Sequence, residues 1–159
     1  MSLARFAGAL SAWAGAVTLL TVAEGRDDIG TTVSAFCPVS ASPPTVLISL
    51  LASGYPAEVL GRADRFAVTV LSAAQRTLAG RFAAAGRPGA RLLLGNVPHQ
   101  RGEASGALIP AGGLAAFEAE VTARIPAADH ILFVGHVLAV PYVAEAGEPL
   151  IRFRGGYFR

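Results

Sequence analysis

The segment from Phe117 to Ile125 alternates strictly between two kinds of side chain, and this alternation limits the possible folds of the chain most strongly. Apolar residues stand at the odd positions, and charged or hydroxyl-bearing residues stand between them. A period of two is typical of a β-strand with one buried face and argues against an amphipathic helix. The polar face carries Glu118 and Glu120, and we expect both carboxylates to be solvated.

A second strand follows after a short turn. Residues 126–129 read Pro-Ala-Ala-Asp, and residues 130–140 are apolar apart from two histidines and a glycine. Strands so close in sequence are expected to pair as an antiparallel hairpin. His130 and His136 lie six positions apart, which is about 20 Å along a strand, so they cannot bind one metal ion together. His130, at the end of the strand, can be reached by a ligand, whereas His136 is expected to be structural.

The other apolar segments add enough strands for a barrel. Strands are expected at residues 17–22, 31–40, 45–51, 65–71 and 149–158. Residues 87–111 are rich in glycine, proline and polar side chains, and they are predicted to be mostly irregular. A closed antiparallel barrel, in a single domain of residues 1–159, accommodates these strands and hides the sheet edges.

Helices are predicted to be few and short. Residues 3–22 superficially resemble an export signal, but polar and bulky interruptions favour a short helix followed by a strand. The same run is too weakly apolar for a membrane span. A second helix is expected from Pro56. A third is opened by a capping box of Ser72 and Gln75 and runs to Gly86.

Charge and cysteine content exclude several classes of function. Thirteen basic residues, all arginine, against eleven acidic ones leave a net charge of +2. The arginines are scattered and do not alternate with aromatic residues, so a nucleic-acid groove is not expected. Cys37 is the only cysteine, which excludes an intrachain disulfide and favours a reducing cytoplasm. The sequence contains no nucleophile elbow, HExxH motif or Walker loop, and Gly86–Gly89 is interpreted as a turn.

Five segments of the chain occur in the order of one known family. They are T-T-V-S-A-F-C-P-V-S-A-S-P-P from Thr31, R-F-A-V-T-V-L-S-A-A-Q from Arg65, R-F-A from Arg81, A-D-H-I-L-F-V-G-H-V from Ala128 and P-L-I-R-F-R-G-G-Y from Pro149. Together they resemble the flavin reductase-like family, the small NAD(P)H:flavin oxidoreductases of two-component monooxygenases. The resemblance covers nearly the whole chain. It implies a mainly β fold, the FMN-binding split β-barrel of Greek-key type with a few short peripheral helices, and a homodimer.

The same resemblance implies where the ligands bind. The strand that contains Thr32 runs along the flavin ring, and the loop from Ser49 to Tyr55 holds the ribityl and phosphate groups. Ala128-Asp129-His130 matches a Gly-Asp-His motif whose histidine places the nicotinamide. The implied flavin contacts are Thr31, Thr32, Val33, Ser34, Ser49, Ser53, Gly54, Tyr55, Arg81 and Phe82. The implied nicotinamide contacts are Asp129, His130, Arg154 and Tyr157.

Three residues depart from the family pattern. Leu51 stands where relatives often have asparagine, Pro56 where serine or threonine often follows, and Ala128 replaces the motif glycine. The first two leave Ser53, backbone N–H groups and Arg81 to bind a phosphate, and they leave the choice between FAD and FMN open. Alanine at position 128 is strained if that position requires a positive φ.

The resemblance implies an NADH-dependent flavin reductase, with NADPH the less expected donor. Such an enzyme transfers hydride to FAD or FMN and supplies diffusible reduced flavin to a partner monooxygenase. The protein would stack the two rings at near-attack distance, about 3–3.5 Å, without a nucleophile or an acid–base pair. The alternative is a non-catalytic flavin- or haem-binding module on the same barrel. Neither interpretation includes a metal site, a nucleic acid or a membrane.

Overall fold

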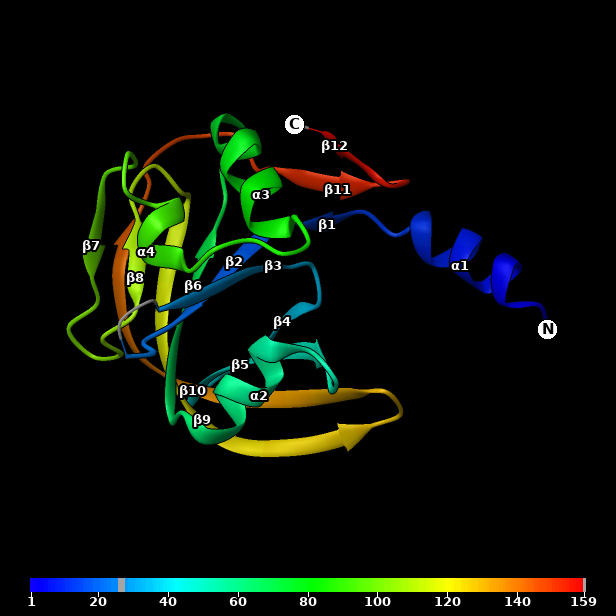
Figure 1. Ribbon diagram of the computed structural model, residues 1–159, viewed down its shortest axis with the longest axis horizontal. Helices are drawn as coiled ribbons and strands as arrows, with labels where there is room; N and C mark the ends of the chain where they lie inside the picture. The colour runs from blue at the N-terminus through cyan, green and yellow to red at the C-terminus, as the bar shows by residue number, and fades with distance from the viewer. Residues whose placement is uncertain (26–27, 159) are drawn as a thin grey trace.

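The fold is mainly β, with short helices at its periphery (Figure 1). The computed structural model describes residues 1–25 and 28–158. Its strands are β1 Gly15–Ala16, β2 Thr18–Val22, β3 Ile29–Val33, β4 Phe36–Ala41, β5 Pro44–Leu51, β6 Arg65–Val70, β7 His99–Arg101, β8 Leu108–Pro110, β9 Ala115–Ala127, β10 His130–Val143, β11 Ile151–Phe153 and β12 Gly156–Phe158. Its α-helices are α1 Leu3–Ser11, α2 Tyr55–Arg62, α3 Arg76–Ala83 and α4 Ala90–Leu93, with a 3₁₀ turn, η1, at Ala73–Gln75.

Seven strands form one antiparallel sheet in the order β3-β2-β6-β9-β10-β5-β4. Its edge strands, β3 and β4, are consecutive in the chain and are separated only by Ser34 and Ala35. A link this short spans about 10 Å, so the sheet must curl until its two edges approach each other. The fold class is therefore the expected one.

The prediction of a closed barrel is wrong, because no ladder joins β3 to β4 in residues 1–25 and 28–158. The bend between these strands is bonded to β5 instead, where the Ser49 N–H donates to the Ala35 carbonyl at 3.0 Å. For the same reason, the single strand predicted at residues 31–40 is two strands. The barrel is split at this bend.

The predicted hairpin is confirmed as the pair of β9 and β10, and its register runs from His130 opposite Ala127 to Val143 opposite Ala115. The connecting turn consists of Ala128 and Asp129. Ala128 has a φ of +53°, so the position does require the left-handed conformation that favours glycine.

Three other expectations need correction. Residues 87–111 hold α4 and the β7–β8 hairpin, because Leu94 and Ile109 are fully buried and tertiary packing orders a segment of weak local signals. The predicted C-terminal strand is the hairpin of β11 and β12, which pairs with β1 in a small second sheet. The helix predicted to reach Gly86 ends at Ala83. The predicted capping box at its start is present, since the Ser72 N–H donates to Gln75 Oε1 at 3.1 Å.

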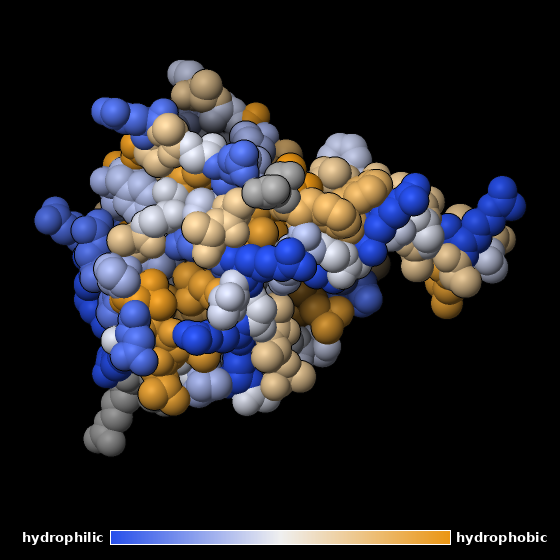
Figure 2. Space-filling model, turned by 90° about the horizontal axis from the view of Figure 1, so that it is seen from above, coloured by the Kyte–Doolittle hydropathy of each residue, from blue (hydrophilic) through white to orange (hydrophobic). Residues whose placement is uncertain are grey.

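Two large clusters of buried side chains form most of the hydrophobic core. One fills the curled sheet and includes Ile48, Phe66 and Phe133, and the other lies beneath α3 and α4 and includes Leu19 and Phe82. The helix expected near the N-terminus is present as α1, but none of its residues is buried, and it projects away from the body of the molecule (Figure 2). Among the described residues, no helix combines the length and apolarity that crossing a membrane demands.

Candidate functional site

A cavity of about 350 Å³ lies between β3, the end of β5 and the start of α2, and we call it the ring cavity. Six of the ten flavin contacts that the resemblance implies line this cavity. They are Thr31, Thr32, Val33, Ser34, Ser49 and Gly54. β3 and the end of β5 meet here because the chain continues from β3 through its bend to the far edge of the same sheet, beside β5.

The strand β3, which forms one wall of the ring cavity, is supported by residues on the side away from the cavity. The Thr18 hydroxyl donates to the Val33 carbonyl at 2.6 Å. Gly30 has no side chain, and a Cβ at this position would collide with the ring of Phe82. Phe82 is fully buried, so the structure places this expected flavin contact in the core beneath β3 and not in the cavity wall. Its role there is to support the strand.

A second cavity, of about 640 Å³, adjoins the ring cavity. The two share three lining residues, Gly54, Pro56 and Arg87. Of the two other expected flavin contacts in this loop, Tyr55 lines only the second cavity, and the exposed Ser53 lines neither cavity. Two of the departures from the family pattern lie in these walls, because Leu51 lines the ring cavity and Pro56 lines both.

Arg87 is the cation where the two cavities meet. Its Nε–H donates to the Gly30 carbonyl at 3.0 Å, and Nη1–H donates to the Ala84 carbonyl at 3.3 Å. The side chain is half-buried, and burial lowers the pKa of its guanidinium. Within residues 1–25 and 28–158, no carboxylate oxygen lies within 4.0 Å of it. A half-buried cation without a carboxylate partner favours an anionic ligand.

Arg81, the arginine that the resemblance assigns to the phosphate, is exposed on α3 and lines neither cavity. The sequence reasoning missed Arg87. Its only local signal is its place between Gly86 and Pro88, in a segment that is predicted to be a turn, whereas the structure has a turn at residues 85–86 and irregular backbone at residues 87–89. Nothing in that turn indicates which way the side chain points.

His130 lies next to the ring cavity at the end of the hairpin. It pairs with Leu51 of β5, and the Ala52 N–H donates to the Asp129 carbonyl at 2.8 Å. His130 Nδ1 lies 2.8 Å from Asp129 Oδ1, and this hydrogen bond, with the imidazole's charge, lowers the pKa of the Asp129 carboxyl. Because a carboxylate only accepts, Nδ1 carries the proton, which leaves Nε2 available to a ligand. His136 lies mid-strand, with its Nδ1 3.1 Å from the Pro44 carbonyl oxygen.

With this geometry in view, the comparisons with known proteins identify the family. Residues 10–159 match the model of the flavin reductase like domain. The chain belongs to the flavin reductase-like family.

The relatives are reductases with different flavins. The NADH-dependent FMN reductase AsuE2 of Streptomyces nodosus subsp. asukaensis is 36% identical over 89% of this chain and 76% of its own length. The reductase component of the 4-hydroxyphenylacetate 3-monooxygenase of Thermus thermophilus is 30% identical over 97% of this chain and 94% of its own. The solved structure of the NADH:FAD oxidoreductase SgcE6 of Streptomyces globisporus C-1027, in complex with NAD and FAD fragments, superimposes with a TM-score of 0.90. It is 29% identical and covers 98% of this chain and 91% of its own.

Two residues that the family resemblance assigns to the nicotinamide lie elsewhere in this flavin reductase-like chain. Arg154 is in the turn between β11 and β12, where its backbone N–H donates to the Ser11 carbonyl at 2.8 Å and its guanidinium lies 5.1 Å from the centre of the Phe153 ring. Tyr157 lines a different cavity, together with Arg76. Neither lines the ring cavity of its own chain.

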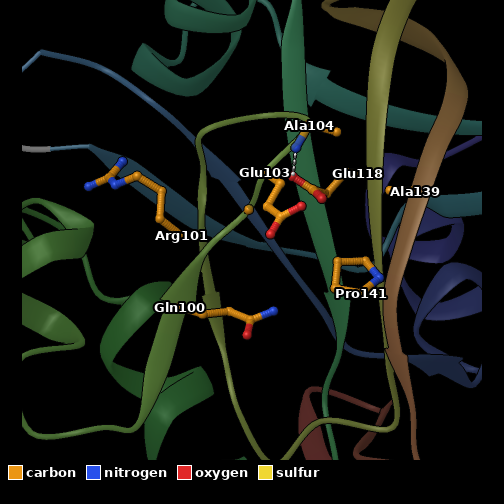
Figure 3. A pocket seen from close by; sticks show the side chains of 8 residues that line it. Gln100, Arg101, Glu103, Ala104, Glu118, Ala139 and Pro141 are labelled. Atoms are coloured by element: carbon orange, nitrogen blue, oxygen red, sulfur yellow. Dashed lines mark hydrogen bonds between the residues drawn. The ribbon is translucent and has the colours of Figure 1, made fainter.

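The prediction that Glu118 and Glu120 are both solvated is wrong. Glu118 lines a further cavity of about 540 Å³ beside β7 and β9 (Figure 3). Glu118 is only 2% exposed, and its Oε1 accepts hydrogen bonds from the N–H of Ala104 at 3.1 Å and from the N–H and hydroxyl of Ser105 at 2.7 and 2.6 Å. Glu120 is half-buried and lies 3.5 Å from Arg65. Glu118 is buried because the loop after β7 folds over its strand, and the carboxylate holds that loop.

Proposed function

We propose that this protein is an NADH-dependent flavin reductase, which transfers hydride from NADH to FAD or FMN and supplies the reduced flavin to a partner monooxygenase. The observation that carries the proposal is the ring cavity, where a hydroxyl-rich strand meets an arginine that has no carboxylate partner among residues 1–25 and 28–158. Two of the relatives described above, AsuE2 and SgcE6, are named as an NADH-dependent FMN reductase and an NADH:FAD oxidoreductase.

The residues of the two cavities fit a flavin. Thr31, Thr32 and Ser34 offer hydroxyl and backbone groups along one wall, which suits the polar edge of a planar ring. Leu51 offers apolar surface at the opposite wall. Arg87 would hold a flavin phosphate, because a partly desolvated guanidinium binds phosphate oxygens strongly.

The chain's own part in the reaction is positioning. A bound flavin supplies the hydride acceptor, so the protein needs no nucleophile. The β3 backbone and Ser49 would fix the plane of the ring, while His130 would set the nicotinamide against it. Asp129 would keep the imidazole in one orientation and one tautomer through the 2.8 Å hydrogen bond.

A homodimer would complete the site. The residues of β5, β10 and β9 that point away from the core include Leu47, Leu51, Leu132, Val134 and Ile125, as the ladder register requires, and we call them the outer face. Leu51 and Ile125 are 48% and 46% exposed, and such a patch is typical of an interface. A second copy is the proposed occupant, because the outer face runs directly into the ring cavity through Ser49 and Leu51.

Flavin is proposed to be a diffusing substrate, because an open surface cavity suits release to an oxygenase. NADH is the proposed donor in preference to NADPH. The single cysteine, Cys37, is free and exposed, which is compatible with the proposed reducing cytoplasm.

The test is NADH oxidation by the purified protein without flavin and with riboflavin, FMN or FAD. We expect turnover only with added flavin. His130→Ala should lower turnover at least tenfold without changing flavin affinity, because the imidazole positions the second substrate only. His99→Ala is the matched control, since His99 is exposed on β7 and its Nδ1 contacts the Val97 carbonyl at 2.7 Å. Flavin binding without turnover would support the binding module instead.

A further inference from the structure

The helix α1 presents an apolar face that is exposed in the single chain. Leu3, Phe6 and Leu10 follow one another at spacings of three and four residues, so they lie on one side of the helix. Their exposed fractions are 84%, 46% and 58%, and Trp13, two residues after the helix, is 79% exposed. Large apolar side chains that are grouped on one exposed face are typical of an interaction surface.

The helix is well formed at both of its ends. The Arg5 N–H donates to the Ser2 hydroxyl at 3.3 Å and caps the N-terminal end. The Arg154 N–H donates to the Ser11 carbonyl at 2.8 Å and connects the C-terminal end to the turn between β11 and β12. Between these ends, α1 extends for about 14 Å away from the body of the molecule (Figure 1). Isolated helices of this length are marginal in water, so a stable α1 needs a surface on which to pack.

The helix begins its excursion at the edge of the surface that is proposed to pair in the homodimer. A Cβ on Gly15 would lie 3.8 Å from Trp13 Nε1 and 4.0 Å from the Ser34 carbonyl oxygen, so the indole lies beside the bend between β3 and β4. Ser34 lines the ring cavity. Ser49 lines it as well, and through Ser49 the cavity runs into the outer face. Trp13, the ring cavity and the outer face are therefore neighbours on one side of the molecule.

We infer that residues 3–13, which we call the arm, pack their apolar face on the second copy of the chain. The second copy is the occupant because the arm projects from the edge of the same surface that this copy is proposed to cover. In a dimer with two-fold symmetry, each arm contacts the other copy in the same way. Trp13 is then buried between the two copies. The inference rests on the homodimer of the proposed function and adds a second set of contacts to it.

The fluorescence of Trp13 tests the arm directly, because Trp13 is the only tryptophan of the chain. In the dimer, at micromolar concentration and without flavin, its emission should be blue-shifted and poorly quenched by acrylamide. Dilution below the dimer dissociation constant should shift the emission to longer wavelength and make quenching efficient. Leu132→Asp combined with Ile125→Asp, which places two charges on the outer face, should give the emission of an exposed indole at micromolar concentration too.

Substitutions on the arm measure its contribution to the dimer. Phe6→Ala combined with Leu10→Ala should raise the dimer dissociation constant at least tenfold in analytical ultracentrifugation, because two apolar anchors leave the interface. Alanine is the best helix former, so α1 itself should remain helical. Arg5→Ala is the matched control. Arg5 is exposed on the opposite side of α1, and its variant should dimerise like the wild type.

Three outcomes would overturn the inference. They are a wild-type dimer in which acrylamide reaches Trp13 as freely as in the outer-face variant, a Phe6→Ala/Leu10→Ala variant with the wild-type dissociation constant, and protection of Trp13 only by anionic lipid vesicles, which would assign the arm to a membrane. Each leaves the reductase intact, because flavin-dependent NADH oxidation is measured separately. A wild-type monomer would refute both the arm and the homodimer. A dimer that buries Trp13 but has no turnover would refute only the reductase.

Discussion

The guanidinium of Arg87 lies where two cavities meet, whereas Arg81, six positions earlier, is exposed on α3. Sequence spacing does not separate these two arginines. The difference arises because α3 ends at Ala83 and the chain then reverses at Gly86, whose φ is +65°. This reversal brings Arg87 back to the Gly30 carbonyl. A side chain that is positioned by a turn and a distant strand is beyond what local sequence can predict.

The strain that the sequence suggested at Ala128 is present in the structure. A φ of +53° costs alanine about 1 kcal/mol of stability. Glycine avoids this cost, but its greater conformational freedom in the unfolded chain offsets part of the gain. We expect Ala128→Gly to stabilise the protein by about 0.5 kcal/mol and to raise Tm by about 1–2 °C. Thermal unfolding followed by circular dichroism measures the shift.

Ala127→Gly is the matched control for this prediction. Ala127 is the last residue of β9 and pairs with His130, so glycine there relieves no strain and weakens a strand. Its Tm should fall. A fall in Tm for Ala128→Gly as well would show that the turn is not strained.

At the scale of elements, Asp28 connects three segments around the second cavity. It directly precedes β3, is 1% exposed, and has Oδ2 3.2 Å from Arg91 Nη2 on α4 and 3.0 Å from Arg101 Nη2 on β7. The Ala90 N–H also donates to its backbone carbonyl at 3.1 Å. These contacts fix the start of β3 relative to α4, and so they hold the loop that carries Arg87.

Asp28→Asn should lower the free energy of unfolding by about 2 kcal/mol, because a buried carboxylate loses its charge-assisted hydrogen bonds to Arg91 and Arg101, whose side chains are about half exposed. Burial raises the pKa of the Asp28 carboxyl, but the hydrogen bonds and charge of Arg101, with Arg91 and the Glu24 N–H, outweigh it and lower the pKa. A lowered carboxyl pKa stabilises the fold above the unfolded value of about 4, and this contribution is lost as pH falls below it.

The difference in Tm between wild type and Asp28→Asn should therefore be constant near neutral pH and shrink below about pH 4. Melting curves from pH 3 to pH 7 provide the measurement. A difference that stayed constant down to pH 3 would mean that the charge of Asp28 does not stabilise the fold.

Elements with a strong periodic signal could be predicted from the sequence, and those ordered by distant contacts could not. The alternation from Phe117 to Ile125 correctly predicts β9, and the turn predicted after it correctly predicts the hairpin. Residues 126 and 127 of that predicted turn belong to β9, and the turn itself is only Ala128 and Asp129. The β7–β8 hairpin has no such alternation, since its order comes from burial of Leu108 and Ile109. The prediction that Glu118 is solvated was wrong because the loop that covers this side chain could not be predicted from its own sequence.

At the scale of the whole molecule, the outer face is partly exposed in the single chain, and α1 is joined to the turn between β11 and β12 by the hydrogen bond from the Arg154 N–H to the Ser11 carbonyl. A nine-residue helix is marginal in water, and α1 buries none of its residues. In the proposed homodimer, the second copy covers the outer face. Leu132→Asp combined with Ile125→Asp should then convert the dimer to a monomer, because two charges would be buried in an apolar interface.

Size-exclusion chromatography with light scattering, at micromolar protein, measures the oligomeric state. Thr77→Asp is the control, since Thr77 is exposed on α3, away from the outer face, and should remain dimeric. Flavin affinity should fall together with dimerisation, because the outer face adjoins the ring cavity. A monomeric wild-type protein would exclude the proposed assembly.

The hairpin of β9 and β10 also has a consequence for the order in which the chain assembles. Its two strands are joined by two residues, whereas β2 and β6 are joined by residues 23–64. Closing a short loop costs less entropy than closing a long one, so we expect the hairpin to belong to the folding nucleus. Relief of strain at Ala128 should then appear mainly as faster refolding and hardly as slower unfolding, which chevron kinetics of the same glycine variant would separate. The turn that places His130 would thus also set the pace of folding.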